Sequence, residues 1–133
     1  MADTKIALRM LIGGLHYCSS ELIKLDPAYK EKFAGIDAVL QWKSEPDGPN
    51  TYTIIKDAKI EFNDDGIHEN PTYTMISKDL HQALDIYKGR NPLSDAIRNG
   101  DIDVIGDKEA LLKITFYLVD LIPLIGELAG VVV

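Results

Sequence analysis

The stretch of sequence that decides the fold is residues 72–112, TYTMISKDLHQALDIYKGRNPLSDAIRNGDIDVIGDKEALL. Its first five residues, 72–76, are mostly β-branched and aromatic, which predicts a strand. Two segments with apolar residues at helical spacing follow, and each ends at a glycine, Gly89 and Gly100. Alternation of acidic and apolar residues over 101–104 predicts a short strand. Helical spacing then returns, so the predicted order is strand, helix, helix, strand, helix.

Local signals mark where these helices begin. We expect Ser77 to cap the first helix, Asn91-Pro92 to start the second and Asp107 to cap the third. The third helix carries apolar residues on two sides, Ala110, Leu111, Ile114 and Leu118 on one and Leu112, Phe116 and Val119 on the other. A helix that is apolar on both sides must be buried on both, by core, ligand or partner.

The N-terminal part of the chain, residues 1–34, is also predicted to be helical. Apolar residues recur there at spacings of three and four, namely Ala7, Leu11, Leu15, Cys18, Leu22 and Leu25. The Gly13-Gly14 pair weakens this helix at its middle, so we expect a bend or a division there. Asp26-Pro27 supplies an N-cap and a first-position proline for a short second helix.

Between the two helical parts, residues 35–77 have strand character, because Ala38, Leu40 and Trp42 alternate with other residues and turn sequences follow. We expect a meander of four antiparallel strands at about 36–43, 52–56, 58–62 and 72–76. The expected organisation is one domain over 1–133, with a helical N-terminus at 1–34, the meander at 35–77, and helices plus the last strand at 78–133.

Composition limits the partners of this chain. Its 133 residues carry a net charge of −7, and the densest basic stretch is Lys30 and Lys32 with Glu31 between them. An acidic surface without a basic cluster repels phosphate backbones, so we expect no nucleic-acid partner. With the single cysteine, Cys18, no internal disulfide can form, which fits a reducing compartment. We expect a cytoplasmic protein.

We expect neither a signal peptide at the start of this sequence nor a membrane span near its end. Residues 1–10 lack the apolar core of a signal peptide. The most apolar segment, 114–133, is interrupted by Asp120, Pro123, Gly126 and Glu127, so it falls short of the about 20 clean residues that a span requires. We interpret it as a docked helix with an apolar tail, and hypothesise that the tail covers a ligand site as a lid.

Metal and catalytic motifs are absent from the sequence. The three histidines, His16, His68 and His81, are scattered, and H-x-C at residues 16–18 has no second ligand pair. An EF-hand loop started at Asp101 fails at Ile105 and Leu112, where oxygen ligands are needed. No nucleophile motif, phosphate loop or zinc-protease motif occurs. We therefore expect no metal, no cofactor and no enzymatic activity.

Four segments resemble the sterol carrier protein type-2 family in order and spacing: GIDAVLQW at 35–42, TMISKDL at 74–80, GRNPLSDAI at 89–97 and NGDIDVIGD at 99–107. One departure is Gly100-Asp101, where the family has a glycine and a cation. The other is the ending Val131-Val132-Val133, which is no peroxisomal address.

The resemblance implies an α+β fold, with a five-stranded, mostly antiparallel sheet covered on one face by helices, enclosing an apolar tunnel. It implies non-catalytic binding and transfer of a sterol, fatty acid, fatty acyl-CoA or phospholipid. We expect the tunnel to be lined by Trp42, Leu84, Tyr87, Leu93, Ile97, Ile102, Val104, Leu111, Leu112, Thr115, Phe116 and Val119. Gln41, Arg98 or Lys113 is expected to meet a polar head group.

Periodicity alone cannot distinguish a lined tunnel from a filled core. The alternative is therefore an interaction or dimerisation module of the same fold with a filled core. Expected partners are a lipid or acyl ligand, with transient contact to a membrane or a lipid-metabolising enzyme, and the chain is expected to be a monomer or a homodimer. A small hydrolase or isomerase is a third interpretation, but no nucleophile and base are paired in the sequence.

Overall fold

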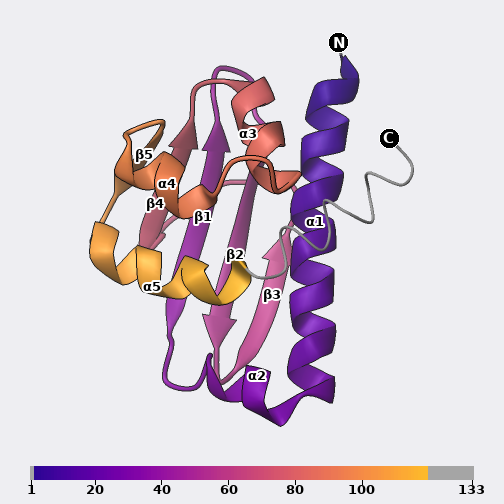
Figure 1. Ribbon diagram of the computed structural model, residues 1–133, viewed down its shortest axis with the longest axis vertical. Helices are drawn as coiled ribbons and strands as arrows, with labels where there is room; N and C mark the ends of the chain where they lie inside the picture. Colours follow the sequence, from indigo (N-terminus) through magenta and orange to yellow (C-terminus); the bar gives the residue numbers. More distant parts are fainter. Residues whose placement is uncertain (1, 120–133) are drawn as a thin grey trace.

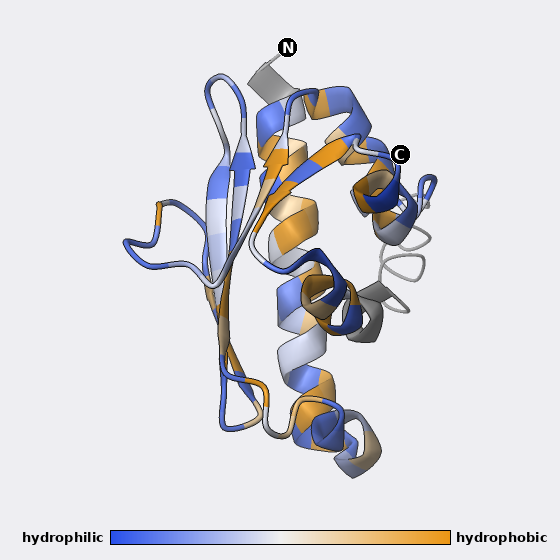
Figure 2. Ribbon diagram, turned by 90° about the vertical axis from the view of Figure 1, so that its left-hand side faces the viewer, coloured by the Kyte–Doolittle hydropathy of each residue, from blue (hydrophilic) through white to orange (hydrophobic). Residues whose placement is uncertain are grey.

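The structure is a computed structural model that describes the backbone of residues 2–119 and the side-chain burial of residues 4–115. Its elements are α1 (Ala2–Leu25), α2 (Pro27–Glu31), β1 (Ala38–Ser44), β2 (Asn50–Lys56), β3 (Lys59–Asn63), β4 (Tyr73–Ser77), α3 (Leu80–Tyr87), α4 (Leu93–Arg98), β5 (Ile102–Ile105) and α5 (Lys108–Val119). Figure 1 shows the sheet with the helices in front of it, and Figure 2 shows these helices on one side of the sheet. The expected fold class, α+β with helices on one face, is confirmed.

The strands form one five-stranded sheet in the order β3-β2-β1-β4-β5. Three pairings are antiparallel, β1 with β2, β2 with β3 and β4 with β5. The fourth is parallel, with Leu40 of β1 opposite Tyr73 of β4. The expected four-stranded meander is therefore wrong at its last strand, although the sheet as a whole is mostly antiparallel.

The parallel pairing follows from the course of the loop at 64–72. Trp42 of β1 packs against α3, so its neighbour Gln41 faces the opposite side of the sheet. The buried Gln41 side chain donates from Nε2 to the Gly66 carbonyl at 3.1 Å and accepts at Oε1 from the His68 amide at 2.7 Å. The loop is thus held across the far face, and β4 enters beside β1 in the same direction.

Helix α1 is continuous through its glycines, so the expected division at Gly13-Gly14 does not occur. Its buried face also differs from the expected stripe. The most buried side chains are Leu8, Ile12, Leu15, His16, Ser19 and Ile23, whereas Leu25 is 77% exposed. A hydropathy pattern does not count Ser19 as a buried position, because its side chain is polar. It is nevertheless fully buried, and its hydroxyl bonds to that of Tyr29 at 2.9 Å.

Two of the three capping predictions are confirmed. The carboxylate of Asp26 accepts from the amide of Ala28 at 3.0 Å, at the start of α2. Asp107 accepts from the amide of Glu109 at 3.1 Å, at the start of α5. Each cap satisfies amides that would otherwise have no partner within the helix.

The expected Ser77 cap is wrong, because Ser77 is the last residue of β4 and pairs with Ile102 of β5. Asp79 caps α3 instead, accepting from the amides of His81 and Gln82 at 2.9 and 3.4 Å. The Ser77 hydroxyl donates to the Asp79 carbonyl at 3.1 Å. Pairing with β5 extends the strand and moves the start of the helix by two residues.

Candidate functional site

An internal cavity of about 20 Å³ lies between the sheet and the helices, and side chains from α1, β1, β2, β4, α3, α4 and α5 line it. Its apolar wall comes from Ile12 and Leu15 of α1, Leu40 of β1, Met75 of β4 and Leu93 of α4. Each of these five side chains is buried. Both layers of the fold therefore contribute to the wall of the cavity.

Two aromatic side chains form another part of the wall. The rings of Trp42 and Tyr87 meet edge to face, with centroids 5.2 Å apart. Trp42 donates from Nε1 to the hydroxyl of Ser44 at 2.9 Å. Burial raises the pKa of the Tyr87 phenol above its usual range, so this group is neutral. The pair joins the central strand of the sheet to α3.

A buried histidine lies at the side of the cavity formed by α1 and β2. His16 donates from Nδ1 to the carbonyl of Ile12 at 2.7 Å and accepts at Nε2 from the hydroxyl of Thr53 at 2.6 Å. Its ring stacks on Phe62 with centroids 4.4 Å apart. Burial lowers its pKa to about 4. The imidazole is thus neutral, with both nitrogens engaged.

The structure brings four of the predicted lining residues to the cavity: Trp42, Tyr87, Leu93 and Thr115. Four others, Ile97, Ile102, Leu111 and Leu112, are buried in the core, and Leu84 and Val104 are half-buried against it. Phe116 and Val119 lie in α5, but their side chains are outside the described residues, as is the segment 121–133 that we hypothesised to be a lid.

Sequence reasoning missed most of the wall on α1, β1, β2 and β4, including His16, Thr51 and Thr53. A usable signal existed, because Thr51, Thr53 and Ile55 alternate along β2 and all three are buried. A hydropathy pattern overlooks threonine, although its β-branched side chain suits the inward face of a strand.

The three residues expected to meet a head group lie elsewhere. Gln41 is buried on the far face of the sheet, where it also donates to the carbonyl of Thr51 at 3.0 Å. Arg98 and Lys113 have exposed side chains. The expectation for Gln41 is wrong, since its amide is used to hold the loop at 64–72.

Among the described side chains, the space at this cavity is small. Pockets that bind small molecules typically have volumes of about 300–1,000 Å³. The about 20 Å³ between the described side chains is enough for one group the size of a water molecule. A larger guest needs more room than the described side chains leave.

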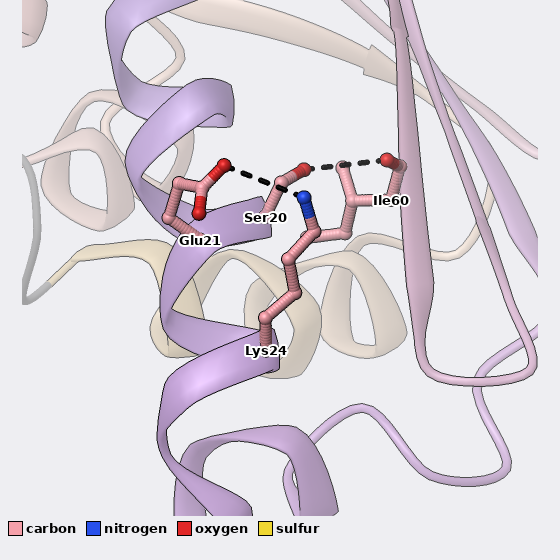
Figure 3. Close-up of polar contacts among 4 residues, drawn as sticks. All are labelled: Ser20, Glu21, Lys24 and Ile60. Atoms are coloured by element: carbon pink, nitrogen blue, oxygen red, sulfur yellow. Dashed lines mark hydrogen bonds and ion pairs between the residues drawn. The ribbon is translucent and has the colours of Figure 1, made fainter.

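A larger hollow of about 600 Å³ lies on the surface, between the second half of α1, the start of α2 and the hairpin of β2 and β3. Two contacts lie at this place, as Figure 3 shows: the hydroxyl of its lining residue Ser20 donates to the carbonyl of Ile60 at 3.3 Å, and its lining residue Lys24 pairs with Glu21 at 3.4 Å. Its rim is charged, with Lys24, Lys30, Lys59, Asp57 and Glu61. The hollow is open to solvent, and both signs of charge occur among its lining residues.

The described residues contain neither a metal-binding group of side chains nor a membrane-spanning helix. No group of three or more His, Cys, Asp or Glu side chains within that part of the chain could hold a metal ion. No helix within it is long and apolar enough to cross a bilayer.

No protein-family model matches the sequence, and no curated protein does either. Solved structures do match. A UbiJ-SCP2 ubiquinone synthesis protein is 18% identical, with a TM-score of 0.59, covering 83% of this chain and 88% of that one. A sterol carrier protein 2 is 11% identical, with a TM-score of 0.60, covering 85% and 93%. A palmitated SCP2L2 from Aedes aegypti is 18% identical, with a TM-score of 0.55, covering 78% and 90%.

At these identities the likeness is one of fold, and it extends over most of each chain. It agrees with the resemblance of the four sequence segments, which the structure places in β1, β4, α3, α4 and β5. The described part of this chain therefore has the fold of the sterol carrier protein 2 domains.

Proposed function

We propose that this protein binds a lipid-like ligand between its sheet and its helices and has no catalytic role. The observation that carries the proposal is the cavity between the layers, whose wall is mostly apolar and comes from both of them. The fold likeness supports it, since one of the similar structures, the Aedes aegypti SCP2L2, is palmitated. A release of ligand to a membrane or an enzyme, in the cytoplasm, would make the protein a carrier.

Binding must supply the energy that opens the cavity. Burying one methylene contributes about 0.8 kcal/mol, so a chain of ~12 methylenes contributes roughly 10 kcal/mol before costs. Association and ordering cost several kcal/mol, and separating α3 and α4 from the sheet adds to that. We therefore expect about micromolar affinity, with little selectivity for chain length.

The only tryptophan of the chain, Trp42, lies in the cavity wall and reports on occupancy. A fatty acid or alcohol brominated at mid-chain quenches tryptophan emission by close contact. We expect saturable quenching of Trp42, reversed by an unbrominated competitor. Absence of saturable quenching by every brominated lipid would contradict the proposal.

A matched control moves the reporter to the surface. Tyr17 is 68% exposed on α1, so the double variant Trp42→Phe/Tyr17→Trp places the single tryptophan outside the cavity. We expect this variant to show only collisional, non-saturable quenching. Equal saturable quenching in both proteins would place the lipid on the surface of the molecule.

The outer face of α1 favours a second candidate function, self-association. Ile6, Met10 and Tyr17 are 57%, 71% and 68% exposed, and their spacing places them on one face with Gly13. A twofold axis beside Gly13 and Gly14 would set Met10 of one copy opposite Tyr17 of the other. Such a patch is self-complementary, as a symmetric dimer requires.

Sedimentation separates the two candidates. A Cβ added at Gly14 meets no atom within 4 Å, so we expect the monomer to tolerate Gly14→Leu, while the larger side chain blocks close approach of a second α1. The dimer candidate predicts a wild-type dimer and a monomeric Gly14→Leu. A monomeric wild type that quenches saturably with brominated lipid supports the carrier alone.

A further inference from the structure

Two hydroxyl groups in the cavity wall have no hydrogen-bond partner among the described residues. They belong to Thr51 of β2 and Tyr87 of α3, which face the cavity from the sheet and from the helical layer. The residues are 1% and 5% exposed. Every fully buried side-chain oxygen or nitrogen in the described part has a partner, so these two hydroxyls still reach open space.

The other polar side chains of the wall are satisfied. His16 and Thr53 bond to each other at 2.6 Å. Thr115 donates to the carbonyl of Leu112 at 3.2 Å. Thr51 and Tyr87 therefore differ from their neighbours, and the difference is not one of residue type, because Thr51, Thr53 and Thr115 are all buried threonines.

These two hydroxyls reach the cavity but have no partner there among the described residues, and a buried hydroxyl without a partner costs free energy. Valine at position 51 and phenylalanine at position 87 would keep nearly the same shape without that cost. The cavity beside the two groups, about 20 Å³, accommodates one oxygen atom with its hydrogens. The wall is thus complementary to a polar atom that a guest brings.

The charge of the wall restricts that atom further. The described residues that line the cavity include no Lys, Arg, Asp or Glu. His16, the one titratable base among them, is held neutral with both nitrogens engaged. A carboxylate or phosphate would enter without a counter-charge, and an unpaired buried charge is strongly unfavourable. A neutral oxygen carries no such cost.

We propose that the ligand is a long apolar molecule ending in a neutral oxygen, an alcohol or a carbonyl, which Thr51 and Tyr87 bind through their hydroxyl groups. This inference rests on the proposed lipid binding and names the class of lipid. A tyrosine and a threonine hydroxyl can each donate or accept, so together they suit an alcohol, and as donors they suit a carbonyl.

The test compares three ligands with the same dibrominated C18 chain: the alcohol, the carboxylate at pH 8 and the hydrocarbon. Quenching of Trp42 gives the affinity of each. We expect the alcohol to bind about tenfold more tightly than the hydrocarbon, and the carboxylate to bind no more tightly than the hydrocarbon. Thr51→Val and Tyr87→Phe should each weaken alcohol binding roughly three- to tenfold and leave hydrocarbon binding unchanged.

Thr115→Val is the matched control, since it removes a cavity hydroxyl that already has a partner. It should leave the preference for the alcohol unchanged. Thr51→Val and Tyr87→Phe should also melt no lower than the wild type, which separates a binding role from a structural one. Equal affinity for alcohol and hydrocarbon, or tighter binding of the carboxylate, would overturn this inference while lipid binding stands. If none of the three ligands quenches saturably, the proposed function itself fails.

Discussion

At the scale of single residues, Gln41 links β1 to the loop that leads into β4. This side chain is 1% exposed and lies within hydrogen-bond distance of four backbone groups from the middle of β1. Two of them hold the loop at 64–72, which directs β4 into its parallel position. Hydropathy gives no reason to place a glutamine in the core, so the sequence suggested a head-group contact instead.

We predict that Gln41→Leu lowers the free energy of unfolding by roughly 2–4 kcal/mol, because several buried partners lose their hydrogen bonds. Urea unfolding measures the loss, and hydrogen exchange at the amide of His68 should become faster. Gln82→Leu is the control, since the half-buried side chain of Gln82 makes no hydrogen bond within the described part. Equal effects of the two substitutions would contradict the role of Gln41.

The buried imidazole of His16 should make the stability of the fold depend on pH. Its pKa is about 4 in the folded protein and about 6.5 in an unfolded chain. Between these values the unfolded state binds a proton and the folded state does not, so the fold loses stability as the pH falls from about 6.5 to 4. The loss is roughly 3 kcal/mol at the lower end.

The measurement is the free energy of unfolding at pH 7 and pH 4.5 in wild type and in His16→Gln. Glutamine does not titrate, whereas the acidic residues that also respond to pH are the same in both proteins. We expect the difference between the two pH values to be about 2 kcal/mol smaller in the variant. An unchanged difference would mean that His16 is accessible to protons in the fold.

At the scale of elements, local chemistry was predictable and pairing at a distance was not. The caps at Asp26 and Asp107 act over two or three residues, so the sequence specifies them by itself. The position of β4 depends on Gln41 meeting a loop that begins 23 residues later in the chain. The buried face of α1 includes Ser19, which bonds to Tyr29 of the next helix, and a pattern of apolar residues does not contain that contact.

The residues of the candidate site were likewise only partly predictable from the sequence. Trp42, Tyr87 and Leu93 were found because apolar patterns and the family resemblance both indicate them. Thr51 and Thr53 were missed because threonine counts as polar. The volume of the cavity could not be predicted at all, since it is the small remainder left by many side chains that pack against one another.

Alanine substitutions at two glycines, Gly14 and Gly106, should have opposite effects on stability. Gly14 lies inside α1 in open space, so Gly14→Ala should raise the free energy of unfolding by about 1 kcal/mol. Gly106 lies between β5 and α5 with φ +115°, and a Cβ there would lie 2.9 Å from the carbonyl oxygen of Thr72. Gly106→Ala should therefore lower the free energy of unfolding, by more than about 1 kcal/mol. Thermal melts measure both effects: the melting temperature should rise in Gly14→Ala and fall in Gly106→Ala. A shift in the same direction in both variants would contradict this account of α1 or of the turn.

At the scale of the whole molecule, the central question is where two closed layers separate. The start of α4 lacks the side-chain cap that α2 and α3 have. This helix has six residues, and its N-cap, Pro92, makes no side-chain hydrogen bond. Leu93, its first residue, lies in the cavity wall. Movement of α4 would therefore enlarge the cavity while β1 and β2 stay paired.

We predict that the amides of α4 exchange with solvent much faster than those of β1, on the scale of local opening rather than global unfolding. A saturating long-chain alcohol should slow exchange in α3 and α4, because the bound chain is sealed by the same helices that admit it. Exchange in the hairpin of β2 and β3, beside the surface hollow, should stay unchanged. Protection of that hairpin, with α4 unaffected, would mean that the guest binds on the surface and that the layers do not separate.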